Sequence, residues 1–102
     1  MMTQDKSYWL NVENHIQALL NLCKDSLDLE SVEAVQHYID HDEYEMAFEG
    51  LFIELMKLGR LPNIGNWNDY LDLGHSLGLD KESVFDAEFW PRFESFVLRQ
   101  SG

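Results

Sequence analysis

The segment from residue 32 to residue 59 constrains the fold most, because its second half is apolar around most of a helical circumference. Six apolar residues recur at helical spacing on one face: Tyr44, Ala47, Phe48, Leu51, Leu55 and Leu58. Phe52, Ile53 and Met56 widen that face, and a narrow stripe for solvent remains at Glu45 and Glu49. A helix of this kind is normally covered by neighbours on several sides. The pattern predicts a central helix in a small bundle, capped by Asp42 and ended by Gly59.

Shorter amphipathic patterns predict the helices that surround this central one. We expect helices at about residues 7–24, 29–39 and 67–77, with Ser7, Asp28 and Asn66 as their caps. Gly74 on the inner face of the 67–77 helix predicts a close approach by another helix, and Gly78 should end it. A final helix begins near Trp90, because Pro91 is tolerated only in a first turn.

No segment shows the alternation or the turn-bounded β-branched runs of a strand. The 102 residues suit one domain. The sequence therefore predicts an all-α fold, a single compact bundle of about five helices spanning residues 1–102, with no sheet. The segment 61–66, rich in Pro and Gly, is the one clear long loop.

The formal net charge of −12 is the strongest signal in the composition. It disfavours nucleic acid and anionic membrane, whose phosphates are negative, and favours cationic partners. The single cysteine, Cys23, excludes a disulfide within the chain and lies on the inner face of the first helix, so we interpret it as a core thiol. We expect no signal peptide and no membrane span, which makes the cytoplasm the default location.

Two histidines, His37 and His41, are the candidates for a chemical site. His37 and His41 would lie one turn apart if the helix continued, as in zinc sites, but a helix break is expected at Asp40 or His41. The alternative is a pair of surface histidines at a helix C-terminus. No catalytic set and no phosphate loop is suggested by local spacing. We therefore predict no catalytic residue, no metal site and no cofactor.

Acidic residues cluster at the junction of the second and third helices, and we call this cluster the acidic corner. It consists of Asp40, Asp42, Glu43, Glu45 and Glu49. A solvated corner is the simplest reading, but carboxylates around aromatic anchors also form interaction edges for basic partners. The residues predicted to bind a partner are Asp40, Asp42, Glu43, Tyr44, Glu45 and Glu49, with Trp67 and Tyr70 as further aromatic candidates. Trp67 and Tyr70 also lie on the inner face of their helix, so packing in the core is the simpler interpretation for each of them.

The segment HYIDHDEYEMAFEGL, followed by a loop, NWNDYLDLGHSLGLD and FWPRF, resembles small helical immunity proteins of bacterial polymorphic toxin systems. The resemblance is to the Maf-type and contact-dependent-inhibition immunity group and covers roughly residues 32–93. Its pattern falls on these positions: His37, Tyr38, Glu43, Tyr44, Glu45, Ala47 and Leu51.

This resemblance implies an inhibitor that neutralises one cognate toxin C-terminal domain, with a basic nuclease of the EndoU-like RNase type as the guess for that domain. Such a protein would occlude the active site of the toxin with an acidic and aromatic surface. Two alternatives stay open: an acidic helical adaptor that binds basic peptides or proteins, and a metal-dependent enzyme that uses His37 and His41.

Overall fold

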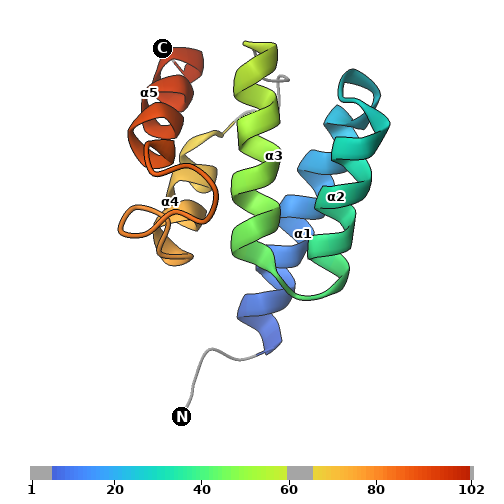
Figure 1. Ribbon diagram of the computed structural model, residues 1–102. Coiled ribbons are helices and arrows are strands. Elements are labelled where there is room, and N and C mark those ends of the chain that lie inside the picture. The colour runs from blue at the N-terminus through green and yellow to red at the C-terminus, as the bar shows by residue number, and fades with distance from the viewer. Residues whose placement is uncertain (1–5, 60–65, 102) are drawn as a thin grey trace.

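The computed structural model describes residues 6–59 and 66–101, and these form five α-helices and one short 3-10 turn (Figure 1). The helices are α1 (Lys6–Cys23), α2 (Leu29–Asp40), α3 (Tyr44–Leu58), α4 (Asn68–Ser76) and α5 (Phe89–Ser101). The 3-10 turn, Lys24–Ser26, joins α1 to α2. The described residues contain no strand, which confirms the predicted all-α bundle. Most of the predicted 61–66 loop lies outside the described residues.

Helix α3 lies at the centre of the bundle, as its sequence predicts. It contacts α1 and α2 on one side and α5 on the other (Figure 1). Phe48, Leu51, Phe52 and Leu55 are each 1% exposed, so the apolar face of the helix is enclosed along most of its length. Leu58, in its last turn, is the exception at 43% exposed.

The ends of α2, α3 and α4 follow local backbone chemistry. Asp28 accepts a hydrogen bond from the Ser31 N–H at 2.8 Å, which confirms it as the cap of α2. Gly59 and Gly78 both adopt φ = +82°, the left-handed conformation that ends a helix, as predicted. Asn66 accepts a hydrogen bond from the Asn68 N–H at 3.0 Å and so satisfies one donor at the start of α4.

Three predicted caps do not occupy the cap position. The cap position of α4 is Trp67, one residue after the predicted Asn66. Ser7 lies inside α1, which already includes Lys6. Asp42 does not cap α3, because the cap position is Glu43 and the Asp42 backbone turns to φ = +60°. The Asp42 carboxylate instead accepts a hydrogen bond from the Tyr44 hydroxyl.

Gly74 permits the close helix approach that its position predicts. A Cβ atom on Gly74 would lie 2.7 Å from Trp90 Cζ3 and 3.4 Å from Phe48 Cε1. The Trp90 ring is held between His75 and Phe93, at centroid distances of 4.7 and 5.2 Å. Glycine is therefore needed here for α5 to pack against α4. Among the described residues, no helix has the length and apolar character required to cross a membrane.

We predict that Gly74→Ala lowers the free energy of unfolding by about 1–2 kcal/mol, because overpacking the Trp90 contact outweighs the gain in helix propensity. Gly50→Ala is the matched control. Its Cβ would meet Phe85 and Val35 at 3.7 and 4.0 Å, which are ordinary contacts. That variant should be neutral or up to about 1 kcal/mol more stable. Urea denaturation measures both; equal stability of the two variants would contradict the packing argument.

Candidate functional site

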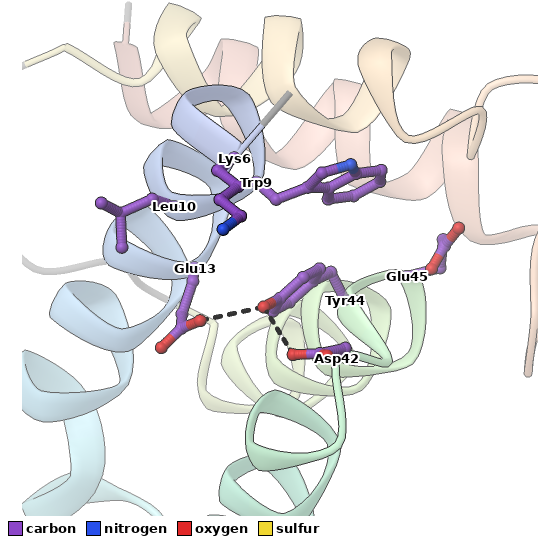
Figure 2. Close-up of a pocket in the computed structure, with 7 residues that line it drawn as sticks. All are labelled: Lys6, Trp9, Leu10, Glu13, Asp42, Tyr44 and Glu45. Carbon is purple, nitrogen blue, oxygen red and sulfur yellow. Dashed lines mark hydrogen bonds between the residues drawn. The ribbon is translucent and has the colours of Figure 1, made fainter. Parts of the chain in front are cut away.

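A cleft of about 720 Å³ opens between the start of α1 and the start of α3 (Figure 2). Helix α1 contributes one part of its lining and the acidic corner before and within α3 contributes the other. The lining residues are Lys6, Trp9, Leu10, Glu13, Asp42, Tyr44 and Glu45. The cleft thus combines three carboxylates, two aromatic rings and one ammonium group.

Two stacked aromatic rings join the sides of the cleft. Trp9 and Tyr44 have ring centroids 5.6 Å apart and planes inclined by 21°. Tyr44 is only 5% exposed, whereas Trp9 is 37% exposed. The buried tyrosine ring therefore supports an indole whose surface remains available to a ligand.

The Tyr44 hydroxyl lies between two carboxylates. Its oxygen is 2.9 Å from Glu13 Oε1 and 3.0 Å from Asp42 Oδ1 (Figure 2). A single hydroxyl proton is shared between two acceptors, so most of the acceptor capacity of both carboxylates is left over. Burial, followed by these hydrogen bonds, raises the pKa of Tyr44 far above that of a free tyrosine.

The charges of the cleft favour a cation. Glu13, Asp42 and Glu45 contribute three negative charges against one positive charge from Lys6. Glu13 and Asp42 flank the same hydroxyl and repel each other, and an added cation relieves that repulsion. A guanidinium or ammonium group could also lie against the exposed face of Trp9.

The structure brings together only part of the predicted partner-binding set. Asp42, Tyr44 and Glu45 line the cleft. Asp40 and Glu43 are exposed but lie outside its lining, and Asp40 accepts a hydrogen bond from Gln36 at 3.0 Å. The acidic corner is therefore split between a cleft and ordinary surface.

Three of the predicted partner-binding residues are buried, which corrects their assignment. Trp67 and Tyr70 are each 6% exposed, and their rings pack near Phe52 at 6.3 and 5.9 Å. Glu49, expected to face solvent, is 0% exposed. The helical spacing of Glu45 and Glu49 predicts a solvent-exposed stripe, but the segment between α4 and α5 covers Glu49.

Glu49 anchors that covering segment. Its carboxylate accepts hydrogen bonds from three consecutive backbone N–H groups, those of Val84 at 2.7 Å and of Phe85 and Asp86 at 2.8 Å. The described residues pair no Lys or Arg with it. Charge-assisted hydrogen bonds therefore offset the cost of burying the carboxylate. Glu49 is a structural residue, and it holds Val84 and Phe85 at the surface, 41% and 50% exposed.

The α1 side of the cleft is absent from the sequence prediction. The periodicity of the first helix places Trp9 on its inner face and Glu13 on its outer face. The available signal was their spacing of four residues, because an aromatic residue and an acid one turn apart lie side by side on a helix. Which partner segment they face is decided by the packing of α1 on α3.

The remaining chemistry is limited. Cys23 is buried, and burial raises the pKa of its thiol, consistent with the predicted core thiol. Within residues 6–59 and 66–101, no group of three or more His, Cys, Asp and Glu side chains is placed to hold a metal ion.

Comparison with known proteins finds no match among protein-family models, curated proteins or solved structures.

We predict that Glu49→Gln lowers the free energy of unfolding by about 1–3 kcal/mol, because an amide has one acceptor oxygen and leaves at least one buried N–H unsatisfied. The amides of Val84, Phe85 and Asp86 should also exchange with solvent faster. Glu45→Gln, one turn earlier and exposed, is the control and should change stability by less than about 0.5 kcal/mol. Unchanged exchange at residues 84–86 in the Glu49 variant would refute the anchoring role.

We further predict that Tyr44 contributes stability that is lost at alkaline pH. Folding raises the pKa of Tyr44 above the unfolded value of about 10, so its contribution is complete below pH 10 and declines as the pH rises above it. Tyr44→Phe removes the titrating hydroxyl and the two hydrogen bonds it makes. The wild type should be more stable than this variant at pH 7, and the difference should shrink between pH 10 and 11. Urea denaturation at each pH measures it, and a difference that stays constant contradicts the assignment.

Proposed function

We propose that this chain is an immunity protein that binds and neutralises a cognate bacterial toxin domain with a basic surface, most simply a nuclease. The observation that carries the proposal is the cleft between α1 and α3, where Glu13, Asp42 and Glu45 share the lining with the partly exposed Trp9. Three further features support it: the net charge of −12, the absence of a catalytic set in the sequence, and the resemblance of residues 32–93 to immunity proteins.

The chemistry of the cleft suits an arginine or lysine side chain of the partner. A carboxylate pair accepts the N–H groups of a guanidinium, and the indole face adds a cation–π contact. Lys6 lines the same cleft, so the incoming cation would displace its ammonium group or share the three carboxylates with it. A nuclease is cationic where it binds phosphates, and an inhibitor with converging carboxylates can occupy that surface.

The proposed function sets requirements for affinity and rate. An inhibitor that competes with RNA inside a cell needs a dissociation constant of nanomolar or below, about −12 kcal/mol. The acidic charge accelerates encounter, and it does so most at low salt. Buried aromatic contacts then slow dissociation. The exposed indole of Trp9 is the candidate for such a contact.

We predict that the triple variant Glu13→Gln, Asp42→Asn, Glu45→Gln weakens binding by at least 100-fold and reduces the salt dependence of the association rate, because it removes the three negative charges of the cleft. The probe is the C-terminal domain of the protein encoded immediately upstream, produced as a catalytically inactive variant. Surface plasmon resonance at 50 and 300 mM salt measures the rates. The matched control neutralises three exposed acids outside the cleft, Asp25, Glu30 and Glu94, and so changes the net charge equally.

Growth rescue tests the biological role. Expression of the active upstream domain should arrest growth, and co-expression of this chain should restore it. Equal binding by the two triple variants would move the interface away from the cleft. No rescue and no complex would refute immunity, and micromolar binding to many basic peptides in their place would favour the adaptor alternative.

A further inference from the structure

Two imidazole rings lie side by side at the end of α2. The ring centroids of His37 and His41 are 4.1 Å apart, with planes inclined by 36°, and both residues are exposed. The helix break expected here does not separate them. α2 runs to Asp40, and the His41 N–H still bonds the carbonyl of His37 at 3.1 Å, so the two side chains remain one helical turn apart.

The hydrogen bond of the His41 ring determines which of its two ring nitrogens can bind a metal ion. Nδ1 of His41 lies 2.8 Å from the carbonyl oxygen of His37. A carbonyl can only accept a hydrogen bond, so Nδ1 carries the proton and, in the neutral ring, Nε2 carries the lone pair. Histidines that bind metals commonly donate their second N–H to a carbonyl in this way, which orients the ring and makes the ligating nitrogen more basic.

We propose that His37 and His41 form a bidentate surface site for a divalent transition-metal ion of the imidazole-binding class, such as Zn²⁺. Metal–nitrogen bonds of about 2.0–2.1 Å hold two ligating nitrogens roughly 3 Å apart, and exposed side chains with rings already 4.1 Å apart reach that spacing by small rotations. The last carbonyl groups of α2 add a partial negative charge that favours a cation.

The site is open. No third protein ligand joins the pair among the described residues, so water fills the other coordination positions of the metal. Two ligands make the site weaker than a structural zinc site, which has four, and binding should be micromolar in strength. The imidazole donors select Zn²⁺ over Mg²⁺, which prefers oxygen ligands.

The experiment is calorimetric titration of the full chain at pH 7.5 with ZnCl₂, and with MgCl₂ as the comparison ion. We expect one Zn²⁺ per chain and no matching Mg²⁺ event. His37→Gln and His41→Gln should each weaken Zn²⁺ binding at least about tenfold. Both residues are exposed, so their variants should fold as the wild type does, which circular dichroism verifies.

His15 provides the matched control. Its Nδ1 bonds the carbonyl of Asn11 at 2.8 Å, the same arrangement as in His41, and its ring contact is with Tyr70 instead of a second imidazole. His15→Gln should therefore leave Zn²⁺ binding unchanged. Zn²⁺ affinity that is unchanged in either His37→Gln or His41→Gln, or that is matched by Mg²⁺, would overturn the proposal.

Discussion

The structure depends on enclosing the broad apolar face of α3. α1 and α2 cover one side and α5 covers another, and these are the usual contacts of a helical bundle. The side that carries Glu49 is closed by the irregular segment between α4 and α5. The Glu49 carboxylate accepts hydrogen bonds from three backbone N–H groups of this segment. The Glu49 carboxylate thus satisfies three donors of the segment, and these hydrogen bonds replace its own lost hydration.

The carboxylates of this chain therefore have two different roles. The carboxylate of Glu49 is surrounded by donors and sealed from water, so it is committed to the fold. The carboxylates of Glu13 and Asp42 share one hydroxyl proton from Tyr44 in a cleft that is open to solvent. Their remaining acceptor capacity, beside the exposed Trp9, is what makes the cleft suited to a cationic partner.

Sequence predictions that depend on contacts between near neighbours in the chain are accurate. Those that depend on contacts between distant segments are less so. The central helix, the Asp28 cap and the two ending glycines depend on contacts within a few residues, and the structure confirms them. The Asp42 cap failed because its carboxylate bonds a tyrosine hydroxyl that is itself positioned by α1. Trp67 and Tyr70 were ambiguous between core and surface, since helical periodicity identifies a face without identifying what covers it.

The sequence by itself determined an all-α architecture, a strongly acidic surface and the central place of α3, because these follow from composition and from apolar periodicity along the chain. Only the tertiary structure decided which acids remain available. Glu45 and Glu49 lie one turn apart on the same helix, yet one lines an open cleft and the other is 0% exposed. The difference arises from residues 84–86, more than 30 positions away in the chain, whose approach to α3 no local pattern encodes.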